Sequence, residues 1–253
     1  MKSRLIKLLL ISTALFFAPL AQAEPLTVAI AANLKYVFED LATEFKKETG
    51  IEAQSVLSAS GKIATQVRNG APFDVFMSAD MEFPDGLYKD GFATTTAKPY
   101  AYGQLVLWTK KEVDLRKGVI VLADKRVLKV AIANPKVAPF GKQALKVLDY
   151  YKIRAVVEPK LVYGESITQV SQYVDAKVVD VGFSAKSIVI APEAAGKGQW
   201  IDVPTESYEP IAQGIVILKH GSAVNAEAAR KFYGFVLSAK AREIFAKNGY
   251  KLP

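Results

Sequence analysis

Apolar residues along this chain fall into short runs that alternate with longer stretches of helical periodicity. Residues 29–50, "AIAANLKYVFEDLATEFKKETG", contain both patterns: an apolar run leads to Asn33, and an amphipathic helix follows and ends at Thr49-Gly50. The apolar residues that share one face of this helix are Leu34, Val37, Phe38, Leu41 and Phe45. Asn33 therefore lies where a strand passes into a helix, a position at which asparagine commonly caps the helix.

The same alternation continues to the end of the chain. Strands are predicted at 26–32, 51–60, 73–80, 104–109, 127–135, 159–166, 178–185 and 211–219. Helices are predicted after most of them, and the final one is capped by Asn225 and runs to about Lys247. Strands that alternate with helices indicate an α/β fold with largely parallel sheets.

In α/β sheets, ligands bind beyond the carboxyl ends of the strands, where helices begin. Four such turns carry small or polar residues: Ala31-Ala32-Asn33, "SASGK" at 58–62, Pro139-Phe140-Gly141 and Ser166-Ile167. The first turn of a helix has N–H groups without intrahelical partners and about half a positive charge. These turns are therefore candidates for an anion site.

Cationic side chains are sparse in these turns. Arginine is absent from all four, and Lys62, Lys136 and Lys142 lie beside the helix starts. A site of neutral N–H and O–H donors suits a fully ionised anion that is bound without water. However, asparagine, serine and glycine at helix starts are also ordinary caps, and propensity alone does not show that the four turns converge.

The N-terminus resembles an export signal. Three basic residues precede the apolar segment Leu8 to Leu20, and Ala21-Gln22-Ala23 is typical of a cleavage site. This apolar segment is shorter than the roughly 20 residues that span a bilayer. We predict a signal peptide at 1–23, cleavage after Ala23 and a soluble exported chain that begins near Glu24.

Composition restricts the possible chemistry. The chain has no cysteine and one histidine, His220, which we expect in a loop without a metal-binding or catalytic role. The formal net charge of +8 falls to +5 without residues 1–23, and the basic residues are spread rather than clustered, so we expect no nucleic-acid partner. We therefore expect no catalytic residues, no cofactor and no direct cation ligand.

Several longer stretches resemble one known family. They are "AANLKYVFEDLATEFKKETG" (31–50), "SGKIATQVRNGAPFDVFMSAD" (60–80), "YGQLVLWT" (102–109), "VAIANPKVAPFGKQAL" (130–145), "VGFSAKS" (181–187), "YEPIAQGIVILK" (208–219) and "KAREIFAKNGYKLP" (240–253). Together they are similar to the molybdate-binding proteins of bacterial ABC importers, which are periplasmic binding proteins of type II. The resemblance covers nearly all of the exported chain, in order.

The resemblance implies two α/β lobes joined by a two-strand hinge and closing on one oxyanion, either molybdate or tungstate. We expect lobe I at 24–102 and 212–253, and lobe II at 103–211. The resemblance also implies a periplasmic location, a monomer and delivery of the anion to an inner-membrane ABC permease with its ATPase.

The resemblance also suggests site residues. Asn33 and Ser60 would donate from side chain and backbone in lobe I, and the backbone N–H groups of Phe140 and Ile167 would donate from lobe II. Ala32 and Gly61 would assist, through a backbone N–H group and by keeping the turn open. Many family members have a serine in place of Asn33 and a tyrosine in place of Ala185. Our hypothesis is that the amide of Asn33 supplies the donor that this tyrosine supplies elsewhere.

Other readings remain open. A receptor for another small anion, such as sulfate or an organic acid, would share the fold, although an organic-acid receptor generally uses an arginine to hold the carboxylate. An exported enzyme would need metal ligands or a nucleophile with its base. Asp74 and Asp80 resemble acid–base carboxylates, but we expect them to make structural hydrogen bonds near the lobe hinge.

Overall fold

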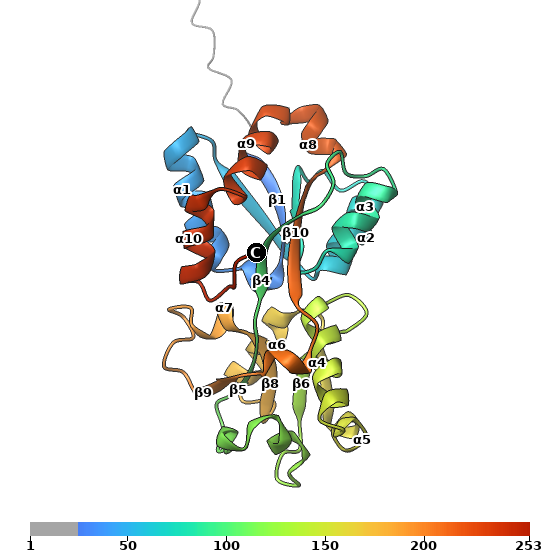
Figure 1. Ribbon diagram of the computed structural model, residues 1–253, viewed down its shortest axis with the longest axis vertical. Coiled ribbons are helices and arrows are strands. Elements are labelled where there is room, and N and C mark those ends of the chain that lie inside the picture. The colour runs from blue at the N-terminus through green and yellow to red at the C-terminus, as the bar shows by residue number, and fades with distance from the viewer. Residues whose placement is uncertain (1–24) are drawn as a thin grey trace, which may run out of the picture.

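The computed structural model describes residues 25–253 as two α/β lobes, one above the other in Figure 1. The first lobe is built on a five-stranded sheet in the order β2-β1-β3-β10-β4. Its strands are β1 (Leu26–Ala31), β2 (Ala53–Ser58), β3 (Val75–Met77), β4 (Lys98–Gly103) and β10 (Ile211–Ile217). The predicted signal peptide lies outside the described residues.

The second lobe has a sheet of the same size, in the order β7-β6-β8-β5-β9. Its strands are β5 (Leu105–Thr109), β6 (Val130–Ala133), β7 (Leu161–Gly164), β8 (Val181–Ala185) and β9 (Gln199–Asp202). The chain passes from one sheet to the other twice, from β4 to β5 across the single residue Gln104 and from β9 back to β10. These two crossings join the lobes (Figure 1).

The sequence prediction of an α/β fold is confirmed, but both sheets are mixed rather than mostly parallel. Strand β1 pairs in parallel with β2 and β3, and β6 pairs in parallel with β7 and β8. In contrast, β10 is antiparallel to β3 and β4, and β5 is antiparallel to β8 and β9. The antiparallel pairs all include a strand next to a crossing between the lobes.

Helices cover both sides of the first sheet. They are η1 (Ala32–Leu34), α1 (Val37–Thr49), α2 (Ser60–Arg68), α3 (Glu82–Lys89), α8 (Lys219–Val224), α9 (Ala226–Val236) and α10 (Ala239–Lys247). Helices α1 and α10 lie on one side of the sheet in Figure 1, and α2 and α3 lie on the other. The predicted final helix is in fact two helices, because Ser238 caps the start of α10 and its hydroxyl accepts from the N–H of Ala241. His220 lies in α8 rather than in the predicted loop.

The second lobe has helices of its own. They are η2 (Leu115–Ala123), α4 (Pro139–Tyr150), α5 (Arg154–Val157), η3 (Glu158–Lys160), α6 (Ile167–Asp175), α7 (Lys186–Val189) and η4 (Thr205–Ser207). Helix α4 follows β6 and α6 follows β7, so both begin at carboxyl ends of parallel strands. These are the ends at which α/β sheets bind ligands.

The predicted apolar stripe of α1 forms part of the core of the first lobe. All five of its residues are buried, although Leu34 lies in η1 and only the other four lie in α1. Phe45 packs edge-on against Phe232 of α9 with ring centroids 5.1 Å apart. Burial of this apolar surface holds α1 and α9 together. Across residues 25–253, no helix combines the length and apolar character needed to cross a membrane.

Candidate functional site

A small cavity lies where the two lobes meet. Its lining residues are Ala31, Ala32, Asn33, Ala59, Ser60, Ala79, Ala138, Pro139, Phe140 and Ile167. All four turns selected from the sequence therefore converge, two from each lobe. None of these lining residues is charged.

Ser60 is a hydroxyl donor held in a fixed orientation. It is the first residue of α2, follows the extended residue Ala59, and is only 1% exposed. Its Oγ accepts a hydrogen bond from the N–H of Ala79, with the two atoms 3.0 Å apart. Since that bond uses a lone pair of the oxygen, the hydroxyl proton of Ser60 remains available to a ligand.

The second lobe presents backbone donors. Pro139 is the first residue of α4, so Phe140 carries the first N–H group of that helix. Ile167 is the first residue of α6, and Ser166 caps this helix by accepting from the N–H of Gln169. The Phe140 and Ile167 N–H groups therefore lie in first helical turns, which have no acceptor within the helix.

Two glycines permit the close approach that forms this cavity. A Cβ atom at Gly141 would overlap the carbonyl oxygen of Ala133, where α4 begins beside the end of β6. A Cβ atom at Gly61 would lie 2.8 Å from the ring of Phe83 and 2.9 Å from the Cα of Val137. The N–H of Gly61 donates to the carbonyl of Val137 at 2.9 Å, so Gly61 joins the lobes rather than facing a ligand through its own N–H group.

Asn33 is not a helix cap, contrary to the sequence expectation. It is the middle residue of η1, whose N-cap is Ala31, and the following helix α1 has Tyr36 as its N-cap. The Asn33 side-chain Nδ2 donates instead to Gln213 Oε1 and to the Tyr250 hydroxyl, each at 3.0 Å. Its Oδ1 is buried without a partner.

The backbone around Asn33 is held by both lobes. Its carbonyl accepts from the hydroxyls of Ser187, in α7, and of Tyr250, each at 2.9 Å. The carbonyl of Ala32 accepts from the Thr168 hydroxyl of α6 at 3.0 Å. Burial raises the pKa of Tyr250 well above its usual value, so this phenol keeps its proton and remains a donor.

Sequence reasoning missed Gln213, Tyr250, Ser187 and Thr168 as parts of this region. Only Gln213 left a readable signal, because it is a single amide inside the apolar strand 211–217 and is fully buried. The position expected to differ from many relatives, Ala185, is the last residue of β8, is 1% exposed, and is not among the residues that line the cavity.

The lysines beside the turns form ion pairs across the lobes. Lys62 of α2 pairs with Glu165 of the second lobe, and Lys142 of α4 pairs with Glu82 of α3 at 2.8 Å. The two pairs have opposite polarity, since the first lobe supplies the cation in one and the anion in the other. With the Gly61, Thr168 and Ser187 bonds, they show that the lobes are in contact in this structure.

Asp74, which is buried, and Asp80, which is partly buried, both have structural partners, as expected, but only one lies near the lobe crossing. Asp74 accepts from the N–H of Thr27, from Asn225 Nδ2, and bonds His220 Nδ1 at 2.8 Å. These contacts place Asp74 beside α8, so the expectation that it lies near the hinge is wrong.

Asp80 lies beside the strand crossing, near Pro139 and Pro210. Its carboxylate accepts from the Ser78 hydroxyl and from the N–H of Phe83. Burial raises the pKa of Asp80 to about 6, although both of these hydrogen bonds act in the opposite direction. Among residues 25–253, no group of three or more His, Cys, Asp or Glu side chains is positioned to hold a metal ion.

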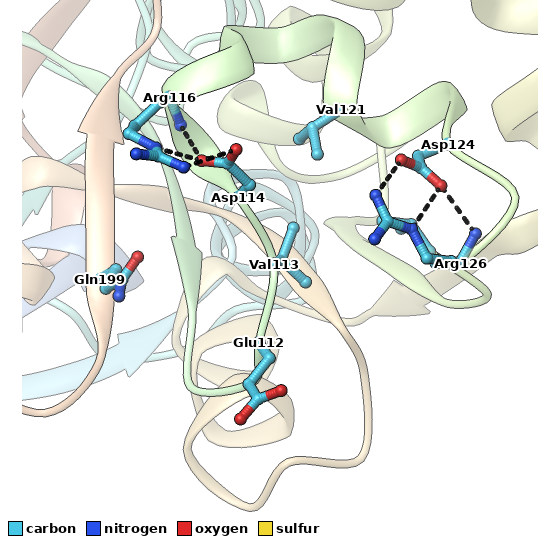
Figure 2. Close-up of a pocket in the computed structure, with 9 residues that line it drawn as sticks. Glu112, Val113, Asp114, Arg116, Val121, Asp124, Arg126 and Gln199 are labelled. Carbon is cyan, nitrogen blue, oxygen red and sulfur yellow. Dashed lines mark hydrogen bonds and ion pairs between the residues drawn. The ribbon is translucent and has the colours of Figure 1, made fainter.

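A larger cavity lies in the second lobe, away from the four turns, and is lined in part by η2. Figure 2 shows that its two arginines are each bound to their own aspartate, Arg116 to Asp114 and Arg126 to Asp124. Both arginine side chains are at least 80% exposed. Their donors are therefore already used or in water, whereas the small cavity is lined by the Ser60 hydroxyl and by N–H groups at helix starts.

Comparison with known proteins agrees with this geometry. Residues 26–251 match the family described as bacterial extracellular solute-binding protein. The chain is 36% identical to the molybdate-binding protein ModA of Azotobacter vinelandii, covering 92% of each protein, and 36% identical to that of Rhodobacter capsulatus, covering 91% of this chain and 89% of the relative.

Solved structures extend the similarity to the fold. The Azotobacter vinelandii periplasmic molybdate-binding protein superposes with a TM-score of 0.83 and 34% identity, over 90% of this chain and 99% of that one. The sulfate-binding protein SubI of Mycobacterium tuberculosis has a TM-score of 0.74 at 16% identity, over 90% of this chain and 86% of that one, which shows a shared fold alone. The chain belongs to the bacterial extracellular solute-binding protein family, in the group that contains the molybdate-binding proteins.

Proposed function

We propose that this protein captures molybdate or tungstate between its lobes and delivers the anion to an ABC permease. The observation that carries the proposal is the cavity itself: four turns from two lobes converge, and their lining residues are uncharged. The relatives named molybdate-binding proteins, at 36% identity, support the same anion class.

In this proposal the anion is held by neutral donors only. Ser60 donates from its hydroxyl and backbone, Asn33 from its amide and backbone, and Phe140 and Ile167 from their N–H groups. Ala32 adds a backbone donor, while Gly61 keeps its turn open. A hydrogen bond to a charged group contributes about 1.5–3 kcal/mol, so about six of them leave a favourable balance after ordering and desolvation costs.

The chemistry of the donors accounts for selectivity. Molybdate and tungstate are tetrahedral dianions of nearly equal size, so fixed donors hold them alike. Sulfate has shorter bonds and would fit the same donor positions loosely. Phosphate usually carries a proton, and a site of donors leaves its hydroxyl without an acceptor, at a cost of about 1–3 kcal/mol.

Capture would couple to transport through lobe closure. The moving bodies would be residues 24–102 with 212–253, and residues 103–211. Anion binding shifts an open–closed equilibrium only by its differential affinity for the closed form. The closed monomer would then dock on the inner-membrane permease, whose ATPase drives release. Export through a signal peptide cleaved after Ala23 would place the chain in the periplasm.

Calorimetric titration of the exported chain with molybdate, tungstate, sulfate and phosphate tests the proposal. We expect tight binding of the first two and much weaker binding of the others. Sulfate binding as tight as molybdate binding would contradict the size argument and favour the alternative, a receptor for another small anion such as sulfate. Binding of an organic acid but not of the oxyanions would favour an organic-acid receptor.

The enzyme alternative has a separate test. Hydrolysis of phosphate or sulfate esters, measured with and without added divalent metal, should stay at background. The single histidine and the absence of cysteine in the sequence support this expectation. Turnover that depends on Ser60 would contradict it.

A further inference from the structure

Two buried side-chain amides face each other behind the cavity. Asn33, in η1, and Gln213, in β10, are 1% and 0% exposed, and Asn33 Nδ2 donates to Gln213 Oε1 at 3.0 Å. The residues are 180 positions apart in the chain. Their contact therefore depends on the complete fold of the first lobe.

This pair is incompletely satisfied. In residues 25–253, three buried side-chain polar atoms have no hydrogen-bond partner, and two of them are Asn33 Oδ1 and Gln213 Nε2. Unpaired buried polar atoms are costly and rare in native proteins, and a functional role is one explanation for them. One unpaired atom is an acceptor and the other is a donor, and they belong to the two side chains that already share a hydrogen bond.

A half-turn of each terminal amide would exchange its oxygen and nitrogen positions. In the exchanged arrangement, Gln213 Nε2 donates to Asn33 Oδ1 and to the hydroxyl of Tyr100. Tyr100 permits this, because its own proton already has a second acceptor, the carbonyl of Ser78 at 2.8 Å. The direction of the bond between the two amides is then reversed.

The exchange changes what Asn33 offers to the cavity. Asn33 lines the cavity, whereas Gln213 and Tyr250, the partners of its Nδ2, do not. The remaining branch of the amide is the unpaired Oδ1, an acceptor that repels an anion. After the exchange, this branch is an N–H donor, as a fully ionised anion requires.

We propose that Gln213 is a positioning residue that sets which end of the Asn33 amide meets the anion. When the anion binds, Gln213 donates to Asn33 and Asn33 donates to the anion. This inference rests on the proposed capture of an oxyanion, and it adds a residue outside the cavity to the determinants of affinity. Tyr250 allows both arrangements: after the exchange, its single hydroxyl proton is donated to Asn33 Oδ1 instead of to the Asn33 carbonyl, which keeps its hydrogen bond from the Ser187 hydroxyl.

A double-mutant cycle tests whether Gln213 acts through Asn33. We expect Gln213→Met to weaken molybdate binding about five- to fiftyfold. Without Gln213 the Asn33 amide has no fixed orientation, so it loses much of its hydrogen bond to the anion. In the Asn33→Ala background, the same substitution should leave the molybdate Kd unchanged, because its effect passes through the missing amide. Gln143→Met is the matched control, since that glutamine bonds Glu209 rather than Asn33, and it should bind normally.

The outcomes separate the inference from the function. If wild-type protein binds molybdate but Gln213→Met binds equally well, or if the two substitutions add independently, the inference is wrong and the proposed function stands. If wild-type protein binds none of the four oxyanions, both are wrong. Thermal unfolding of each variant, measured without anion, shows that the titrations compare folded proteins.

A neutron structure of the wild-type molybdate complex gives an independent test that needs no variant. Deuterium atoms on Asn33 Nδ2 should point to the anion, and those on Gln213 Nε2 should point to Asn33 Oδ1. A complex in which Asn33 Nδ2 still donates to Gln213 Oε1 would overturn the inference.

Discussion

The two lobes present the same kind of turn to the cavity but different chemistry. The first lobe contributes side chains, the Ser60 hydroxyl and the Asn33 amide, in addition to backbone. The second lobe contributes Phe140 and Ile167, whose side chains have no polar atoms, so only their N–H groups can donate. A side-chain substitution can therefore change the donors of the first lobe directly. The donors of the second lobe change only when its backbone changes.

The largest expected effect comes from a negative charge in the first lobe. Ser60→Asp should weaken molybdate binding at least about a thousandfold, because a carboxylate within about 4 Å of a dianion costs several kcal/mol even at an effective dielectric constant of 20. Aspartate is tolerated at the start of a helix, so the fold should persist. Ser60→Asn is the neutral control, and calorimetry should find it far less impaired. Equal losses in both variants would show that shape, rather than charge, governs this position.

The second prediction removes one backbone donor from the second lobe. Ile167→Pro should weaken molybdate binding about 10- to 150-fold, the equivalent of one hydrogen bond to a charged group of about 1.5–3 kcal/mol. Proline is well accepted at the first position of a helix, and Ser166 already has the extended backbone that precedes proline.

Ile167→Val is the control for this change, since it has nearly the same volume as proline and keeps the N–H group. We expect it to bind within a factor of about two of wild type, because no hydrogen bond is lost. A similar loss in both variants would indicate that packing of the side chain, and not its N–H group, matters at the start of α6.

The third prediction concerns stability, because the first lobe also carries a partly buried carboxylate, Asp80, beside the site. Burial raises the pKa of Asp80 from 3.8 to about 6, so the folded protein binds a proton in this window that the unfolded chain does not. The contribution of Asp80 to stability is therefore greatest below pH 3.8 and is lost as the pH rises through about 6.

Asp80→Asn should therefore raise the free energy of unfolding by about 1–2 kcal/mol near pH 7.5, and by little near pH 4. Urea unfolding across this range measures both effects. Asp85→Asn, in the following helix α3, is the control for the loss of one carboxylate from this part of the chain. If the free energies of unfolding of Asp80→Asn and wild type differ by the same amount at all pH values, the raised pKa of Asp80 is contradicted.

The smallest expected effects come from the ion pairs between the lobes. Lys62→Gln and Lys142→Gln should each weaken molybdate binding less than about fivefold, because exposed pairs contribute about 0.2–1 kcal/mol. High salt should reduce the difference between wild type and these variants. Lys46→Gln is the matched control, since Lys46 pairs with Glu52 inside the first lobe. A larger loss would mean that the pairs hold the lobes closed.

The local pattern of the sequence was enough to predict the α/β class and the strands that lead into the four turns. The stripe of α1 and the helix starts at Ser60, Pro139 and Ile167 are set by periodicity and by residue preferences at helix ends. The direction in which strands pair is not local information, so the antiparallel β5 and β10 were predicted as members of largely parallel sheets.

The candidate site was likewise only partly predictable from the sequence. Its donors lie at helix starts, which can be recognised in the sequence, but the partners of Asn33 come from distant parts of the chain. Gln213 lies in a strand, Tyr250 follows the last helix, and Ser187 belongs to the other lobe. Only the folded arrangement brings these groups to one amide, and propensities carry no information about such contacts.

Tyr250, three residues from the end of the sequence, bonds the side chain and carbonyl of Asn33. The surroundings of Asn33 are therefore completed by a residue 217 positions later in the chain. During synthesis this corner cannot assemble until the ribosome has added Tyr250, and a protease that cuts before Tyr250 would undo it. Insertions next to Tyr250 should likewise disturb the wall behind the cavity, because this residue belongs to it.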